Sequence, residues 1–166
     1  MSLILLIKKL PKLFTLPAKE ICWFLMLFPL SGLIRAMLLF VPFKFYRSLL
    51  GAHYDKVQLS SLVLDSEKQL AWRIGILVKL VSRYTPWESM CLVQAIMARV
   101  LFGYYGIPYV LHLGVKLTQD NKEPIKAHAW TIVGPWIITG RGEHKGFTVV
   151  NTFIAPSICE KFSPAK

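Results

Sequence analysis

Apolar residues recur every three or four positions through much of the first hundred residues, and this spacing predicts helices. Up to residue 64 the pattern indicates three helices divided by prolines: residues 3–16 (interrupted at Pro11), Pro17 to about Phe28, and about Ser31–Phe40. Pro42 ends the third helix. Residues 52–64 show no clear period, so we expect a loop or short turns there.

Two longer helices are predicted next. The first begins at an N-cap in Asp65-Ser66 and reaches Tyr84, with apolar residues on one side only. The second covers Met90–Tyr105 after a cap at Ser89, and it is apolar on nearly all sides. A helix of that kind is buried at the centre of a domain.

Beyond residue 108 the apolar positions alternate, which predicts strands. Four are expected: Tyr109–Leu117, Ala127–Val133, Trp136–Thr139 and Phe147–Phe153. Helices first and antiparallel strands last indicate an α+β fold, with the central helix packed on the sheet. We divide the chain into a hydrophobic, basic helical region (1–64), a core (65–155) and a tail (156–166).

Composition adds a membrane question. Of 166 residues, 54% are hydrophobic, mean hydropathy is +0.48 and the net charge is +11. Residues 1–50 hold seven lysines and arginines but only one acidic residue, Glu20. Such a segment suits an anionic membrane surface or an acidic peptide. Because Arg35 interrupts the apolar run after Ile34, we expect a packed or surface-bound helical region rather than a spanning helix.

The cysteines and histidines show no metal-site spacing. Cys22, Cys91 and Cys159 are far apart, which excludes a disulfide framework and a zinc site and indicates a reducing compartment. Cys22 lies in an apolar run and is expected to be buried. No glycine-rich phosphate loop and no nucleic-acid motif occurs, so we expect no cofactor, no metal, no direct use of ATP and no nucleic-acid partner.

Cys91 and His128 are the residues with candidate chemistry. A thiol in the first turn of a helix is stabilised as thiolate by the helix N-terminus, and a nearby histidine strengthens this effect. His128 lies between Ala127 and Ala129, whose small side chains leave room around the imidazole. The pair is 37 positions apart, so only the fold can bring it together. A buried structural cysteine and a core histidine remain the alternative.

Three segments carry a family resemblance: Trp87–Ala95 with Cys91-Leu92-Val93-Gln94-Ala95, then Leu113-Gly114-Val115, then Ala127-His128-Ala129-Trp130. Together they are similar to the leader peptidase of lasso-peptide biosynthesis, the B protein. That family belongs to the transglutaminase-like, papain-like superfamily. Pro42-Phe43-Lys44 and Leu49-Leu50-Gly51 extend the similarity upstream, so that it covers about Lys8 to Phe153.

The resemblance implies a cysteine protease that removes the leader from a ribosomally made (RiPP) precursor, a step of antibiotic biosynthesis. Cys91 would be the nucleophile and His128 the general base. Gln94 would assist in the oxyanion or substrate site, or serve only as a hydrogen-bonding spacer. The superfamily usually has an aspartate just after a segment like Trp136–Thr139, where this chain has Gly140. Either another group orients His128, the site is a dyad, or the copy is weakly active.

The resemblance also implies partners. The chain resembles the stand-alone, split form, which works with a separate leader-binding protein and an ATP-dependent lasso cyclase. We expect it in the cytoplasm, either free or in peripheral contact with the membrane. Two rival functions stay open: a non-catalytic membrane-associated scaffold of the maturation complex, and a transglutaminase-like acyltransferase. The sequence leaves the leader, the cleavage position, the product peptide and the oligomeric state undetermined.

Overall fold

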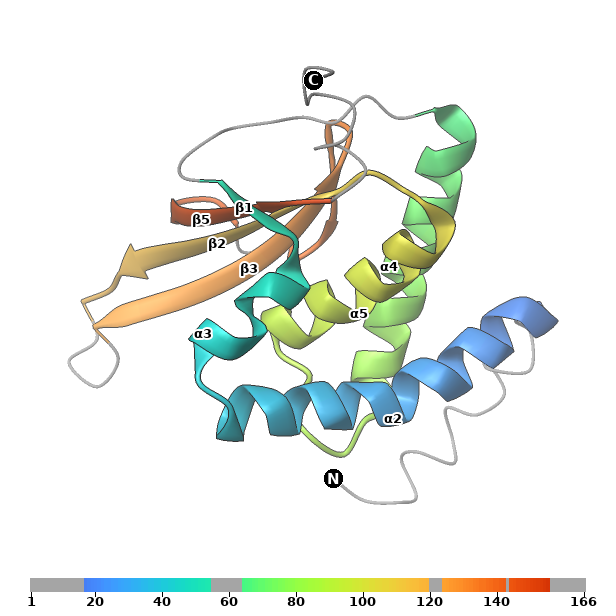
Figure 1. Ribbon diagram of the computed structural model, residues 1–166, viewed down its shortest axis with the longest axis horizontal. Coiled ribbons are helices and arrows are strands. Elements are labelled where there is room, and N and C mark those ends of the chain that lie inside the picture. The colour runs from blue at the N-terminus through green and yellow to red at the C-terminus, as the bar shows by residue number, and fades with distance from the viewer. Residues whose placement is uncertain (1–16, 55–63, 120–123, 143, 156–166) are drawn as a thin grey trace, which may run out of the picture.

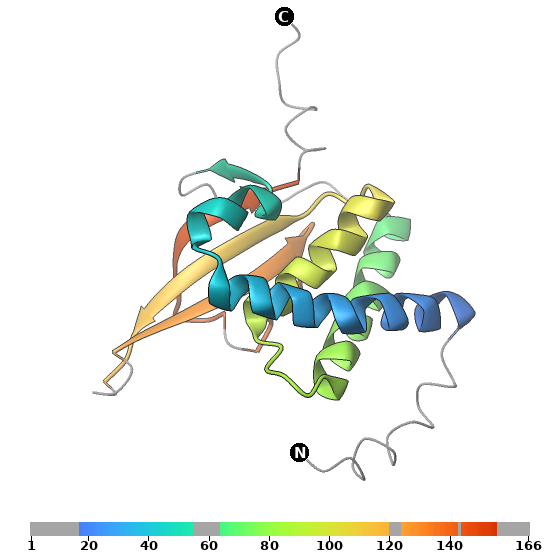
Figure 2. The same cartoon turned by 60° about the horizontal axis from the view of Figure 1, so that its bottom comes forward.

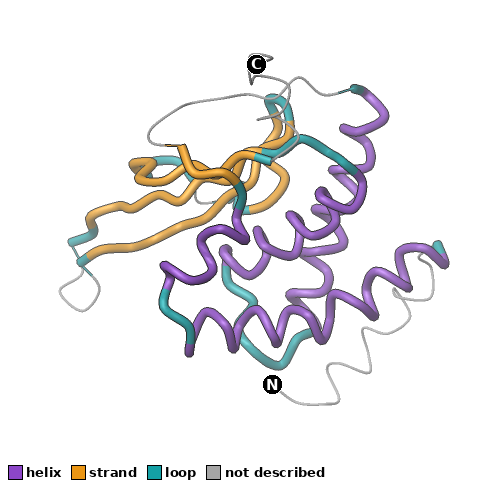
Figure 3. Tube along the Cα trace, in the orientation of Figure 1, coloured by secondary structure: helices purple, strands orange, loops and turns teal. Residues whose placement is uncertain are grey.

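The computed structural model describes residues 17–54, 64–119, 124–142 and 144–155, and it has an α+β architecture (Figure 1). Helices gather on one side of a curved antiparallel sheet, as Figure 3 shows by element type. The helices are α2 (Ala18–Phe40), α3 (Phe43–Tyr46), the 3₁₀ helix η2 (Arg47–Leu50), α4 (Asp65–Tyr84) and α5 (Cys91–Tyr105). The strands are β1 (Ala52–Tyr54), β2 (Val110–Leu117), β3 (Ile125–Val133), β4 (Trp136–Thr139) and β5 (Thr148–Ile154).

The five strands form one sheet in the order β1-β5-β2-β3-β4, and every neighbouring pair is antiparallel. Helix α5 packs on β3 and β4, α4 packs on α5 and β4, and α2 crosses both helices from outside (Figure 2). Val93, Met97 and Leu101 of α5 are buried at this centre. The predicted α+β class, with a central cysteine-bearing helix on an antiparallel sheet and helices ahead of it, is confirmed.

Helix α2 corrects one prediction, because it runs without a break through Pro29. Proline removes one backbone hydrogen bond, which predicted two helices over this stretch. Packing on both sides of Pro29 outweighs that loss: Leu27 and Ile34 are both buried in the main core. The helix ends at Phe40, just before Pro42, as expected.

The predicted helix caps are also wrong. The residue that caps α4 is Leu64, whose N–H donates to the Glu67 carboxylate at 2.9 Å. The residue before α5 is Met90, while the Ser89 hydroxyl bonds the hydroxyl of Thr85 at 2.8 Å. In both cases the residue at the cap position lies one place away from the polar side chain that the sequence favoured.

Among the described strands, β1 is the one that the sequence did not indicate. It has three residues, and Ala52 pairs with Ile154 at the edge of the sheet. A period of two cannot be recognised over three residues, which explains the omission. The four predicted strands are present with ends shifted by at most two residues.

The predicted helix over residues 3–16 and the tail 156–166 lie outside the described residues. Within the described chain, α2 is the helix that is long and apolar enough to cross a membrane by length and composition alone. The division at residue 64 stays a prediction. The core includes Trp23 and Leu50 from before that point, packed with residues of α4 and α5.

Candidate active site

A pocket of about 620 Å³ opens between the start of α5, the face of α4 and the ends of β3 and β4. Both predicted catalytic residues, Cys91 and His128, line it. The fold therefore brings together two residues that are far apart in sequence. The pocket wall also includes apolar side chains and two cations: Trp72, Ile76, Met90, Ile138, Lys79 and Arg141.

Cys91 is the first residue of α5 and is partly exposed. The first hydrogen bond of the helix runs from the N–H of Gln94 to the carbonyl of Met90, at 3.1 Å. The N–H groups of Cys91, Leu92 and Val93 therefore lie ahead of the helical ladder, and the Met90 side chain does not cap them. These donors give the helix N-terminus its partial positive charge, beside the thiol.

His128 lies on β3 and is buried, and aromatic rings hold its imidazole. The ring stacks on Trp130 with centroids 5.9 Å apart, and Phe147 approaches it to 5.3 Å. Gly114 on the paired strand β2 makes this packing possible. A Cβ there would lie 2.8 Å from the Trp130 ring and 3.1 Å from Phe147. Sequence reasoning missed Phe147, because its contact with His128 depends on the pairing of β5 with β2 and not on a motif.

The Nε2 atom of His128 is 2.9 Å from the backbone carbonyl oxygen of Gly140. A carbonyl can only accept, so Nε2 carries a proton and donates a hydrogen bond to the carbonyl of Gly140. The Nδ1 atom is then left with a free lone pair, the form of imidazole that can take a proton from a thiol. Gly140 has φ +72°, a backbone conformation that favours glycine.

The profile of the Transglutaminase-like superfamily matches residues 37–152, which is more than half of the chain. The chain belongs to the transglutaminase-like superfamily. No curated protein and no solved structure matches it. This superfamily includes cysteine peptidases and transglutaminases, so the chain is of cysteine protease or acyltransferase type.

The resemblance leads us to expect an aspartate at position 140, where this chain has glycine. A Cβ at Gly140 would lie 2.4 Å from the carbonyl oxygen of Ala129, so no side chain fits there without moving the backbone. Asn151, a polar residue on β5, bonds His53 at 2.9 Å. Glu143 lies outside the described residues. The partner that the structure gives His128 at this position is a neutral main-chain carbonyl.

Gln94 lines the pocket one turn after Cys91, as its spacing predicted. Its side-chain amide donates to the carbonyl of Ser89 at 2.8 Å. This bond ties the helix to the segment before it, and it agrees with the hydrogen-bonding alternative considered from sequence. The role of Gln94 in binding an oxyanion stays a prediction.

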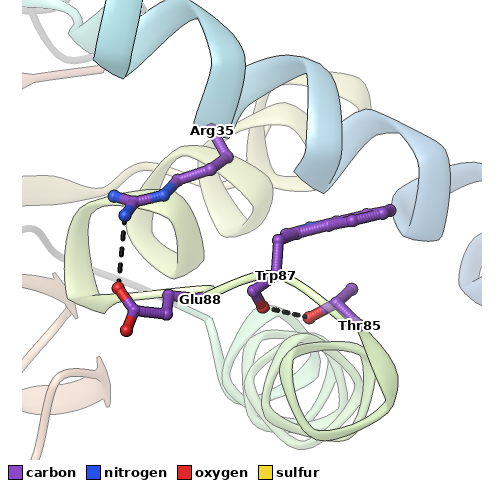
Figure 4. Close-up of polar contacts among 4 residues, drawn as sticks. All are labelled: Arg35, Thr85, Trp87 and Glu88. Carbon is purple, nitrogen blue, oxygen red and sulfur yellow. Dashed lines mark hydrogen bonds and ion pairs between the residues drawn. The ribbon is translucent and has the colours of Figure 1, made fainter. Parts of the chain in front are cut away.

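In this transglutaminase-like domain, α2 holds the segment that leads to Cys91 (Figure 4). The Trp87 indole N–H donates to the Ser31 hydroxyl at 3.0 Å, and the indole lies against Gly32, where a Cβ would be 2.9 Å from the ring. Arg35 pairs with Glu88 at 3.2 Å. Thr85 donates to the carbonyl of Trp87 at 3.2 Å. The first turn of α5 is thereby fixed from the side opposite the sheet.

Proposed function

We propose that this protein is a cysteine protease that removes the leader peptide from a lasso-peptide precursor. It would work with a separate leader-binding protein and with the ATP-dependent cyclase that closes the ring. The observation that supports protease chemistry is the placement of Cys91 and His128 in one pocket, with the proton on Nε2 held by Gly140. The lasso assignment rests on the resemblance of the Cys91 and His128 segments and their order.

The first half of the proposed reaction forms a thioester. The Cys91 sulfur attacks the carbonyl carbon of the scissile peptide bond, and Nδ1 of His128 takes the thiol proton. Negative charge develops on the carbonyl oxygen of the substrate. The backbone N–H groups at the start of α5 are suited to bind that oxygen. The carbon–nitrogen bond then breaks, and His128 returns its proton to the leaving amine, which is the N-terminus of the core peptide.

The second half removes the leader from the enzyme. Water gives a proton to Nδ1 of His128 and its oxygen attacks the thioester carbon. The carbon–sulfur bond breaks, Nδ1 of His128 returns its proton to the Cys91 sulfur, and the leader departs with a free carboxylate. The same thioester would react with an amine in an acyltransferase, so the identity of the second nucleophile separates the two chemistries of the superfamily.

The deciding experiment incubates the full chain with a lasso-peptide precursor and a separate leader-binding protein. Mass spectrometry follows the release of the leader. We expect cleavage by the wild type and a loss of at least about a thousandfold in rate for Cys91→Ala, because no other group supplies the nucleophile. The same exchange at Cys159 is the matched control, and it should leave the rate unchanged.

Each other outcome has a definite meaning. Cleavage by Cys91→Ala at the wild-type rate would overturn the protease proposal. A leader that carries an added amine in place of a free carboxylate would assign acyl transfer. If the wild type leaves the precursor intact but the leader-binding protein still co-purifies with the chain, the rival function as a scaffold is correct.

A further inference from the structure

Helix α2 has two apolar faces, and only one of them packs on the protein. Seven exposed positions on one side of the helix form what we term the outer face: Cys22, Leu25, Met26, Pro29, Leu33, Ala36 and Phe40. Leu25, Leu33 and Phe40 are 64%, 69% and 83% exposed. Figure 2 brings this helix to the front of the molecule, away from the sheet. Cys22 was predicted to be buried, and that prediction is wrong: the residue is exposed and lies on this face.

The opposite face of α2 is bound firmly to the domain. Trp23, Leu27 and Ile34 are buried in the main core, and α2 packs on both α4 and α5. The Trp87 indole and the Arg35–Glu88 ion pair add polar attachments. If α2 crossed a bilayer, these contacts would have to break and the apolar surfaces of α4 and α5 would be uncovered. The folded domain can therefore bring α2 to a membrane only with the helix axis parallel to the membrane surface.

The ionic groups around α2 leave a surplus of positive charge. Glu20 is paired with Arg73, so the acidic residue of the helix is compensated. The exposed cations are Lys19 at the start of α2, and Lys44 and Arg47 just beyond its end. In the sequence, residues 1–19 contain four lysines and no acidic residue. The apolar outer face thus lies between basic groups at both ends.

The chemistry of the outer face favours lipid over a protein partner. Its side chains carry no strong hydrogen-bond donor or acceptor, while a typical protein–protein interface has about ten direct hydrogen bonds. A helix with an apolar exposed side and flanking lysines and arginines is the type that lies in the plane of an anionic membrane surface. We propose that the outer face of α2 docks parallel to an anionic lipid surface. This inference is independent of the proposed peptide substrate.

The test uses the full-length chain and two kinds of vesicles, phosphatidylcholine alone or with about 30% phosphatidylserine. We expect sedimentation with the anionic vesicles at low salt, weaker at high salt because ions screen the charges. The double variant Leu25→Ser with Leu33→Ser should bind at least about tenfold less. The matched control is Leu117→Ser, at an 80% exposed position at the end of β2. Both variants remove exposed side chains, so their melting temperatures should match the wild type.

Depth measurements distinguish an in-plane helix from a span. A fluorophore is attached to Cys22, or to Phe40→Cys in a Cys22→Ala chain, with Cys91 and Cys159 replaced by alanine in both. Quenching by lipids brominated along the acyl chain should give the same depth for both labels. In a span the two labels, 18 residues apart, would differ by about 27 Å along the bilayer normal. That result, or absence of binding to anionic vesicles at low salt, would overturn the proposal.

Discussion

At the scale of single residues, the main-chain carbonyl of Gly140 contacts His128 where the resemblance leads us to expect a carboxylate. It fixes the ring of His128 by accepting from Nε2. A neutral acceptor orients the ring as an aspartate does, but it gives less stabilisation to a positively charged imidazolium. We therefore regard Gly140 as a positioning residue for His128.

The exchange Gly140→Ala tests that role. The new Cβ would meet the Ala129 carbonyl at 2.4 Å, so the carbonyl of residue 140 must move and His128 loses its orientation. We expect the rate of leader release to fall about 10- to 100-fold, as for a misplacement of about 1 Å. Nitrogen chemical shifts of the His128 imidazole should show that Nε2–H is no longer the single tautomer.

Gly106→Ala is the matched control for that exchange. Gly106 also has a positive φ, +65°, but an added Cβ meets nothing within 4 Å. It therefore carries the same backbone strain, of about 1 kcal/mol, without a collision. If the two variants reduce the rate equally, backbone strain rather than the lost carbonyl explains the effect.

The sequence shows which side chains the site contains, but it does not show the contacts that main-chain groups make. Cys91 and His128 were identified because side chains of reactive type stand in a recognisable order. A carbonyl acceptor has no residue type, so the partner of His128 could not be found in this way. Phe147 packs on His128, and Gly114 leaves room for the rings of Trp130 and Phe147; these contacts depend on the pairing of β2 with β3 and with β5.

At the scale of elements, α2 acts as a support for the first turn of α5. Its break at Pro29 was predicted wrongly because local propensity was weighed without the packing that overrides it. The same packing places Ser31, Gly32 and Arg35 against Trp87 and Glu88. The helix that the sequence set apart as an extension is therefore in direct contact with the segment before Cys91.

Replacement of Trp87 tests this support. Trp87→Ala removes a half-buried ring and the bond to Ser31, and we expect the free energy of unfolding to fall by about 2–3 kcal/mol. The rate of alkylation of Cys91 should fall as well, because the first turn of α5 is no longer held. Thiol labelling and denaturant unfolding measure the two effects.

Trp87→Phe keeps most of the ring and loses only the indole donor. It should lower the free energy of unfolding by about 1 kcal/mol and leave the alkylation of Cys91 close to wild type. A Trp87→Ala protein that is less stable but has an unchanged Cys91 rate would show that α2 does not hold the site.

At the scale of the whole molecule, the fold class followed from one change in the spacing of apolar residues, from every three or four positions to every second position. Buried helices and an alternating C-terminal half can be combined in few ways, and the α+β arrangement is one of them. The order of strands could not be read from the pattern. It depends on β5 lying between β1 and β2, and on β1, a strand too short to recognise.

The free energy of unfolding of the whole domain should depend on pH through His112. This residue is buried on β2 beside Thr152, and burial lowers the pKa of its imidazole below the ordinary value of about 6.5. The unfolded chain therefore binds a proton more readily than the native one as the pH falls. The free energy of unfolding should decrease as the pH falls below about 6.5, until His112 is also protonated in the native state.

Urea unfolding at pH 7.5 and 5.5 checks this dependence. We expect the wild type to lose more stability over this interval than His112→Asn, which has no group to titrate at that position. Equal losses in the wild type and His112→Asn would assign the dependence to other groups.

The left-handed backbone of Gly140 also has a consequence for the history of such sites. A mutation of one codon that supplied an aspartate here would place its Cβ against Ala129 and would not create a working triad. A site in which a carboxylate holds the histidine therefore cannot arise from this one by a single substitution, because the backbone at the end of β4 must change as well. A genome search that demands cysteine, histidine and aspartate would discard chains of this kind, although a main-chain carbonyl holds their imidazole.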